Sequence, residues 1–376
     1  MAANGKHSSD DNYLKEIRKD AKKRLYEYVA PKWAEDLRGK PKLKIDLFQK
    51  RTPILKWFLP QIPSDFEIYI KRDDLTGGAI SGHKVRRLEF HLAEALATNC
   101  DTLIGYGCIT SNNCRTLAVS GKELGFDVHL SLYKTLRLKK PSLSFIGNYY
   151  INMILGAHLY LSPESTESSS QKKQTELKQR LSVAGYSPYI VCSGQPGDVG
   201  LFGYIDCFEE LITQGVTEKF SDLVLSCGSG LTAAGFIIGN YRNGGKLRLH
   251  AYSINRSEAE LKKLISDLLK DVNFLPEDFS DERMSSLINI EEESSLSDYC
   301  VFTADHVEFV SETAKRTGIL LDPNYTGKSA YHMVKKLQTA PETFQGKKIL
   351  FYNTGSVISL MTETFCRAIT GNGIMD

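Results

Sequence analysis

Short apolar runs alternate with longer amphipathic segments along most of the chain. Residues 66–72 (FEIYIKR) combine aromatic and β-branched positions in a run of strand length. In residues 83–99, the apolar side chains Val85, Leu88 and Leu92 recur at helical spacing. Further strands are predicted at residues 101–107, 127–133, 157–162, 189–194, 222–228, 247–254 and 348–355. Further helices are predicted at residues 112–125, 148–156, 171–185, 200–214, 230–242, 303–318 and 328–338.

Strands that alternate with helices in this way predict parallel sheets covered by helices, with functional sites at the carboxyl ends of the strands. A chain of 376 residues is long for one core, so we expect an α/β protein with two open, twisted parallel-sheet lobes. Residues 1–45 are polar and predict an extension outside the main core, helical over residues 13–28. The Ser- and acid-rich residues 162–173 and 276–298 predict loops.

Composition narrows the class of protein further. The formal net charge of +2 gives no reason to expect nucleic acid or another polyanion as a partner. No apolar run approaches the ~18 residues of a membrane-spanning helix. The eight cysteines form no C-x-x-C pair, and the N-terminal residues contain no apolar signal core. These features predict reduced thiols and a cytoplasmic location.

A glycine-rich turn between a strand and a helix is the strongest local signal. The strand that ends near Leu225 runs into a loop that can turn backbone amides toward an anion, beside the positive end of the next helix. An ordinary tight turn would have the same composition. The dinucleotide pattern G-x-G-x-x-G is absent, because the next glycine is Gly235. The predicted phosphate loop comprises Cys227, Gly228, Ser229, Gly230, Leu231 and Thr232.

Polar residues gather at other strand ends. Ser111, Asn112 and Asn113 stand where a helix begins, and one of them suffices as its N-cap. Thr354 follows the last strand, and Tyr325 and Thr326 follow a proline turn.

Lys84 follows a small, flexible stretch (GGAISGH) at the start of a helix. It is either one charge of a solvated basic face or an amine held for chemistry. Pyridoxal 5'-phosphate (PLP) would use both a phosphate loop and a lysine amine. The eight histidines show no H-x-x-x-H spacing, and no metal site is predicted.

Five segments in this order resemble one family of PLP enzymes: IYIKRDDLTGG, SGHKVRRLEF, SNNCR, CGSGLTAAG and LLDPNYTGK. The chain is similar over roughly residues 47–365 to the D-cysteine desulfhydrase and 1-aminocyclopropane-1-carboxylate (ACC) deaminase family, of fold type II, the tryptophan-synthase-β-like fold. The resemblance implies a homodimer. It also implies a smaller α/β lobe of residues 88–200, inserted into a larger PLP-binding lobe of residues 46–87 and 201–376.

The resemblance also assigns roles to residues of this chain. Lys84 matches the lysine that binds PLP as a Schiff base, and Asn112 matches the asparagine that bonds the ring hydroxyl. Ser111 matches the serine beside the substrate carboxylate. Residues 228–232 match the phosphate loop, and the tyrosines that match active-site tyrosines are Tyr325 and Tyr299.

Two positions separate the branches of that family. ACC deaminases carry Glu after the first of these tyrosines and Leu before the last strand-tip glycine, whereas this chain has Thr326 and Thr354. Either threonine could face the pyridine nitrogen. The pair indicates the desulfhydrase branch, because a neutral nitrogen is a weaker electron sink and a thiolate leaves more readily than a ring carbon.

Two departures from the family lie on the substrate side: His83 stands where the family has Asn, and Asn113 where desulfhydrases have His. Both are candidate substrate contacts; His83 could instead touch the cofactor, or be a structural histidine. We therefore expect a carbon–sulfur lyase that converts D-cysteine to pyruvate, hydrogen sulfide and ammonia. ACC deamination, elimination from D-serine, β-chloroalanine or cysteate, racemisation and PLP binding without catalysis remain alternatives.

Overall fold

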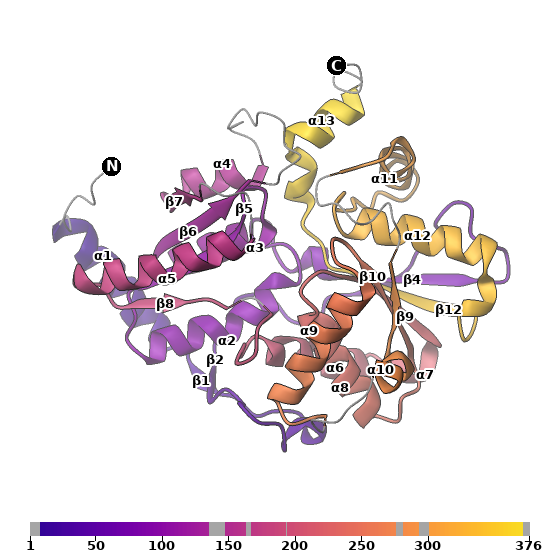
Figure 1. The fold of residues 1–376 in the computed structure, drawn as a ribbon, viewed down its shortest axis with the longest axis horizontal. Helices are drawn as coiled ribbons and strands as arrows, with labels where there is room; N and C mark the ends of the chain where they lie inside the picture. The colour runs from indigo at the N-terminus through magenta and orange to yellow at the C-terminus, as the bar shows by residue number, and fades with distance from the viewer. Residues whose placement is uncertain are drawn as a thin grey trace. The chain divides into compact units, whose positions relative to one another are not determined.

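The computed structural model describes residues 8–134, 147–162, 167–192, 194–275, 281–292 and 301–370. The chain divides into two compact units, each built on its own sheet (Figure 1). Unit 1 comprises Met1–Val29, Pro41–Leu47 and Leu88–Cys192, and unit 2 comprises Ala30–Lys40, Phe48–Arg87 and Ser193–Asp376.

Unit 1 contains a four-stranded parallel sheet in the order β7-β6-β5-β8. Glycines let helices approach this sheet closely: a Cβ atom at Gly105 would lie 2.5 Å from the Leu117 side chain. The strands are β5 (Thr102–Cys108), β6 (Asp127–Tyr133), β7 (His158–Leu161) and β8 (Pro188–Ile190). The helices are α1 (Ser8–Lys22), α3 (Asn112–Glu123), α4 (Gly147–Ile154), α5 (Glu167–Val183) and, from Leu88 on, α2 (Lys84–Ala97). A short antiparallel pair is formed by β1 (Tyr26–Glu27) and β2 (Leu43–Lys44).

Unit 2 contains a six-stranded sheet in the order β11-β10-β9-β12-β4-β3, in which β3 alone is antiparallel. The central strand β9 is buried along its whole length, as the apolar run of residues 223–225 within it predicts. The strands are β3 (Ile54–Lys56), β4 (Glu67–Arg72), β9 (Asp222–Cys227), β10 (Arg248–Ser253), β11 (Asn289–Glu291) and β12 (Lys348–Asn353).

Helices of unit 2 pack on this sheet and on one another. A Cβ atom at Gly239 would collide with Phe208, so α6 and α8 can approach only because position 239 is glycine. The helices are α6 (Leu201–Thr213), α7 (Val216–Lys219), α8 (Leu231–Arg242), α9 (Glu258–Asp271), α10 (Asp281–Leu287), α11 (Ala304–Thr317), α12 (Thr326–Thr339) and α13 (Glu363–Thr370). The 3₁₀ turns among the described residues of this unit are η1 (Lys32–Ala34), η2 (Asp73–Leu75), η4 (Pro341–Thr343) and η5 (Val357–Met361).

The predicted α/β class with two parallel sheets is confirmed. Three local predictions are wrong. The helix expected over residues 13–28 is α1, which ends at Lys22 because the following residues pair as β1 with β2. Residues 167–170, expected as loop, belong to α5, where the Ser170 hydroxyl donates to the Ser131 carbonyl at 2.8 Å.

The third wrong prediction is the loop over residues 276–298. Its described part forms α10 and β11, and β11 adds a parallel edge strand to β10. Residues 276–280 and 293–298 of this segment, and 163–166 of the other predicted loop, lie outside the described residues. The N-terminal residues are also more integrated than their polarity suggests, because a Cβ atom at Gly125 would meet Leu14 of α1 at 2.5 Å.

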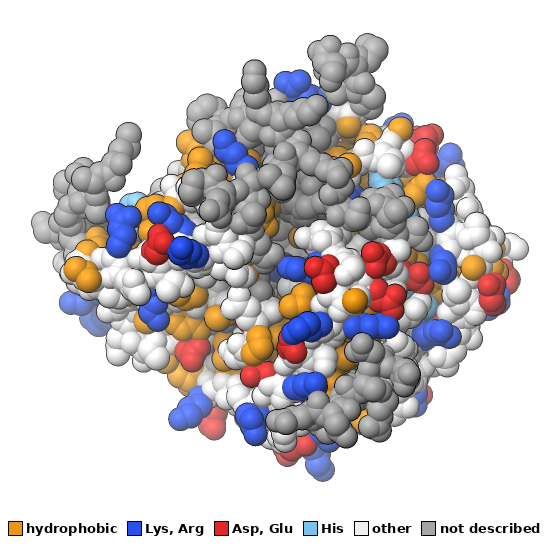
Figure 2. Space-filling view, viewed as in Figure 1, with side chains coloured by type: hydrophobic (Ala, Val, Ile, Leu, Met, Phe, Trp, Pro, Cys, Tyr) orange, Lys and Arg blue, Asp and Glu red, His pale blue; other side chains and the backbone are white. Residues whose placement is uncertain are grey.

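The distribution of charged side chains and the state of the cysteines agree with what the composition predicts. On the face shown in Figure 2, basic and acidic side chains are interspersed, as a formal net charge of +2 leads one to expect. Seven cysteines lie among the described residues, and all are free thiols. No helix in the described part of the chain is long and apolar enough to cross a bilayer.

Candidate functional site

The loop that carries Lys84 lies against the carboxyl end of β12. Gly82 has a φ of +108°, which favours glycine, and a Cβ atom there would lie 2.9 Å from the Thr354 carbonyl oxygen. The Gly82 N–H donates to the Asp73 carbonyl at 3.1 Å, and the His83 N–H donates to the Thr354 carbonyl at 2.9 Å. These bonds place Lys84 and Thr354, far apart in sequence, at one strand tip of unit 2.

Replacing Gly82 with alanine is expected to lower the free energy of unfolding by about 2–4 kcal/mol, because the new methyl group meets the Thr354 carbonyl and the backbone is strained at positive φ. Chemical denaturation measures the loss. Gly39→Ala is the matched control: its φ is +73° but a Cβ atom there has open space. An equal loss in both variants would show that the contact with Thr354 is unimportant.

The Lys84 amine is held in a state suited to condensation with a carbonyl. Burial, reinforced by the nearby Arg87 charge, lowers the pKa of Lys84 from 10.5 to about 8, against the opposing influence of Asp198 and Cys227. Arg87 itself faces Asp198 at 4.0 Å. Within the described part of the chain, the Lys84 amine has no hydrogen bond or ion pair. A lysine with a lowered pKa supplies the unprotonated nucleophile that a Schiff base requires.

His83 is held by the same carbonyl that receives its backbone N–H. Its Nδ1 lies 3.1 Å from the Thr354 oxygen, so Nδ1 carries the proton. The ring packs between Tyr204 and Tyr352, with centroids at 5.5 and 6.2 Å. Burial and the Lys84 charge lower the pKa of His83 to about 3, which keeps the imidazole neutral. This geometry supports a structural role, and substrate contact by His83 stays a prediction.

The predicted phosphate loop connects β9 to the N-terminus of α8. Gly230 adopts a φ of +80° directly before the helix, and a Cβ atom there would lie 2.9 Å from Ile265. The first N–H groups of α8 have no acceptor within the helix, and its dipole is positive at this end. Arg256 reaches the loop, where its Nε donates to the Gly228 carbonyl at 3.1 Å. Burial raises the pKa of Cys227 to about 12, so its thiol stays neutral.

Tyr325 and Thr326 stand at the start of α12, beside this loop. A Cβ atom at Gly228 would lie 3.5 Å from the Tyr325 ring. The Thr326 hydroxyl accepts from the Asp322 N–H at 2.8 Å and donates to the Asp322 carbonyl at 3.3 Å. By contrast, no hydrogen bond of the Thr354 hydroxyl is found among the described residues. Of the two threonine hydroxyls, only that of Thr326 is hydrogen-bonded within the described part of the chain.

A second group of predicted residues lies in unit 1, where β5 leads into α3. Ser111 is the N-cap of α3, and its hydroxyl accepts from the Cys114 N–H at 3.2 Å. The Asn112 Oδ1 accepts from Asn148 Nδ2 at 2.6 Å. Because this oxygen is an acceptor, the amide nitrogen of Asn112 has a defined direction. The Asn113 Oδ1 is buried and has no partner in the described ranges.

Asn148 and Arg256 are residues that sequence reasoning missed. Asn148 is oriented by Arg115, whose Nε donates to its Oδ1 at 3.2 Å, and by the Thr110 carbonyl at 2.8 Å. Neither residue belongs to a motif, because each reaches its partner only through the fold. Tyr299, predicted as a second site tyrosine, lies outside the described residues.

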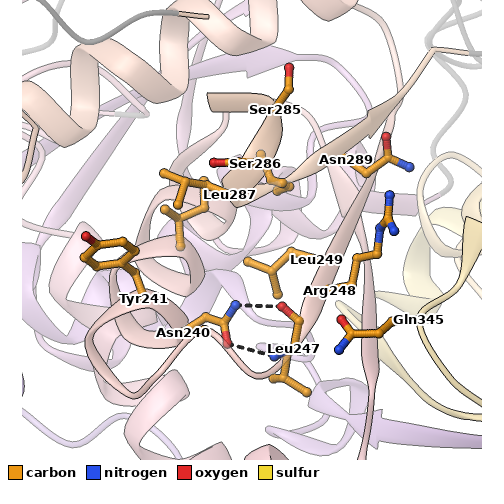
Figure 3. A pocket seen from close by; sticks show the side chains of 13 residues that line it. Asn240, Tyr241, Leu247, Arg248, Leu249, Ser285, Ser286, Leu287, Asn289 and Gln345 are labelled. Atoms are coloured by element: carbon orange, nitrogen blue, oxygen red, sulfur yellow. Dashed lines mark hydrogen bonds between the residues drawn. The ribbon is translucent and has the colours of Figure 1, made fainter. Parts of the chain in front are cut away.

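A cavity of about 440 Å³ in unit 2 lies elsewhere (Figure 3). It is lined at the amino ends of β10 and β11 by Arg248 and Asn289, and none of the predicted site residues lines it. Within it, the Asn240 side chain is bonded to Leu247, donating to its carbonyl at 2.7 Å and accepting its N–H at 3.2 Å. These hydrogen bonds stabilise the turn after α8, so Asn240 has a structural role in this cavity.

The residues of unit 2 fit PLP. A glycine loop at a helix N-terminus suits a phosphate, the Lys84 amine suits an aldehyde, and the Thr354 hydroxyl can bond a ring atom. The half-buried position of Lys84 and the lowered pKa of its amine favour this role over that of one charge on a solvated face.

Comparisons with known proteins agree with this fit. Residues 45–355 match the family model described as pyridoxal-phosphate dependent enzyme. The chain is 34% identical to a bifunctional mitochondrial D-cysteine desulfhydrase/ACC deaminase from Arabidopsis thaliana, over 89% of this chain and 83% of that protein. It is 30% identical to a putative ACC deaminase from Pyrococcus horikoshii, over 84% of this chain and 92% of that protein.

Solved structures extend the comparison. An ACC deaminase homologue shares 28% identity and superposes with a TM-score of 0.74, over 91% of this chain and 99% of that one. A hydrogen sulfide-producing enzyme from Fusobacterium nucleatum, 17% identical with a TM-score of 0.57 over 84% and 95%, shares the fold. The chain therefore belongs to the pyridoxal-phosphate-dependent enzymes, in the family of D-cysteine desulfhydrases and ACC deaminases.

Proposed function

We propose that the protein is a carbon–sulfur lyase that converts D-cysteine and water to pyruvate, hydrogen sulfide and ammonia. The observation that carries the proposal is the hydroxyl of Thr354, uncommitted among the described residues, at the strand tip beside Lys84. The other candidate partner of the ring nitrogen, Thr326, also lacks a carboxylate, and its hydroxyl is bonded to Asp322. Without a carboxylate to keep that nitrogen protonated, the site suits a substrate with a good leaving group.

The roles of the chain's residues follow from their chemistry. Bound PLP supplies an electron sink for the charge that develops when the substrate's α-proton is removed. Lys84, with its pKa of about 8, can take that proton at Nζ and hold it near neutral pH. The glycine loop and α8 anchor the phosphate. Ser111 at the substrate carboxylate, Asn112 at the ring hydroxyl, and Asn113 and Tyr325 on the substrate side remain expectations from the resemblance.

Substrate assays test the function. PLP-loaded protein is incubated separately with D-cysteine, L-cysteine, D-serine and ACC, and sulfide, pyruvate and 2-oxobutyrate are measured. We expect sulfide and pyruvate from D-cysteine, with kcat/KM at least tenfold above that for the other substrates. Release of 2-oxobutyrate from ACC would instead support deamination, which the names of the relatives make the second candidate. Bound PLP with no turnover would indicate a binding protein.

The two threonines can be separated by matched variants. Thr354→Val is expected to lower kcat for elimination about 3- to 10-fold, the value of one hydrogen bond to a neutral group. Thr326→Val is expected to lower the free energy of unfolding by about 1–3 kcal/mol, because it leaves the buried Asp322 N–H without its acceptor, with a smaller effect on kcat. Measuring kcat and the free energy of unfolding of both variants decides which threonine faces the ring nitrogen. The reverse pattern would assign that role to Thr326.

We also propose a homodimeric assembly, a cytoplasmic location and a division into a smaller and a larger lobe. A homodimer and the lobe boundaries at residues 88–200 rest on the family resemblance. A cytoplasmic location rests on the free thiols, although the relative from Arabidopsis thaliana is named as mitochondrial.

A further inference from the structure

Two histidines and an aspartate meet at one edge of the sheet in unit 1. Asp127 and His129 are two residues apart on β6, so their side chains share a face of the sheet. His158 begins the edge strand β7 and is the register partner of His129. One possible ligand atom from each of the three lies within 4.8 Å of the other two.

Two distances in this cluster match those between neighbouring ligand atoms of a tetrahedral metal ion. The Asp127 Oδ2 lies 3.3 Å from His129 Nε2 and 3.2 Å from His158 Nε2. Zinc bonds of about 2.0–2.1 Å in tetrahedral geometry separate neighbouring ligand atoms by about 3.3–3.4 Å. Two imidazole nitrogens and one carboxylate oxygen form a common donor set for zinc and related divalent ions.

Neighbouring groups hold the ligands in place. The Asp127 Oδ1 accepts from Lys122 Nζ at 3.1 Å and from the Val128 N–H at 3.0 Å, which leaves Oδ2 turned toward the histidines. The His129 Nδ1 lies 2.9 Å from the Tyr160 hydroxyl. A ligating histidine usually bonds through its second nitrogen in this way.

The cluster is also accessible. The His129 side chain is 5% exposed and that of His158 is 52% exposed, so an ion can reach the site and keep a water molecule. The histidine rings stack with centroids 4.3 Å apart, which brings both Nε2 atoms to the same carboxylate oxygen.

We propose that Asp127, His129 and His158 bind one divalent transition-metal ion, with Zn²⁺ as the preferred ion. The ion would join the edge strand β7 to β6 and stabilise unit 1. The spacing of these residues in the sequence does not indicate a metal site, because the two histidines lie on separate strands and meet only through the register of the sheet.

The test uses the full-length PLP-loaded protein after treatment with a chelator and dialysis. Calorimetric titration with ZnCl₂ is expected to show one bound ion per chain, and the melting temperature is expected to rise with Zn²⁺. Titration with Co²⁺ is expected to give visible bands of nitrogen and oxygen coordination. A thiolate-to-cobalt charge-transfer band would place the ion at a cysteine and overturn the proposal.

Variants assign the ligands. His158→Ala and Asp127→Asn are each expected to weaken Zn²⁺ binding at least about tenfold. His158→Ala alters a half-exposed side chain, so circular dichroism in the absence of metal should match the wild type. His91→Gln, in the same unit but bonded to Tyr189 at 3.1 Å, is the control. Equal affinity in all four proteins, or no binding to the wild type, would overturn the site.

Discussion

Lys84→Ala is expected to lower the rate of elimination more than about 1,000-fold, because it removes a side chain proposed both as the attachment point of the cofactor and as the base. The fold should survive. Lys84 has no ion pair among the described residues, and alanine is the best helix former at the first position of α2. Lys84→Arg should be equally inactive, since a guanidinium keeps its charge and does not form a Schiff base.

Borohydride reduction and peptide mass spectrometry measure the attachment directly. In the wild type, the reduced cofactor should be found on the peptide that contains Lys84, and in both variants no covalent label should form. Lys336→Ala, which alters a lysine paired with Glu291 at 3.0 Å on α12, serves as the control and should retain label and rate. Turnover by Lys84→Ala with label on another lysine would remove Lys84 from the mechanism.

Periodicity predicted the two sheets because buried parallel strands have continuous apolar sequences and their covering helices are amphipathic. Strand β9 and helix α2 illustrate both cases. The missed elements are short and lack such a signal. Strand β11 has three residues, and it exists because its backbone pairs with β10. Such pairing is a tertiary effect that outweighs local composition.

The site residues show the same difference between features encoded locally in the sequence and features created only by the fold. Lys84 and the glycine loop were predicted because a flexible turn before a lysine and a glycine turn before a helix are local motifs. Asn148 was missed because its hydrogen bond to Asn112 joins α4 to α3. Arg256 was missed because its hydrogen bond to the Gly228 carbonyl joins segments far apart in the sequence. The cluster at Asp127 was missed because strand register creates it.

Beneath the Lys84 loop lies a buried ionic network centred on Asp73. Its Oδ2 accepts from Arg86 Nε and from the Tyr352 hydroxyl, each at 2.6 Å. Its Oδ1 accepts from the Thr52 hydroxyl at 2.7 Å and from Arg86 Nη2 at 2.8 Å. Arg86 also pairs with Glu210 at 3.0 Å. The Asp73 carbonyl accepts from Gly82, so the network supports the loop directly.

Asp73→Ala is expected to lower the free energy of unfolding by about 3–5 kcal/mol, because it leaves Arg86 buried with only part of its counter-charge. Glu67→Gln, which removes one partner of the exposed pair with Lys56, is the control and should cost less than about 1 kcal/mol. Urea denaturation measures both. Similar small losses would mean that Glu210 alone compensates Arg86.

Acid unfolding tests the same network without deleting a side chain's volume. Burial alone would raise the pKa of Asp73, but Arg86 and Lys71 hold it well below its usual range. Because the unfolded chain then takes up the proton first, the contribution of Asp73 is complete above about pH 4 and is lost as the pH falls further. Asp73→Asn has no such proton to bind, so its free energy of unfolding should fall less steeply below pH 4 than that of the wild type. Parallel curves for the two proteins would show that Asp73 is not held ionised by Arg86 in the folded state.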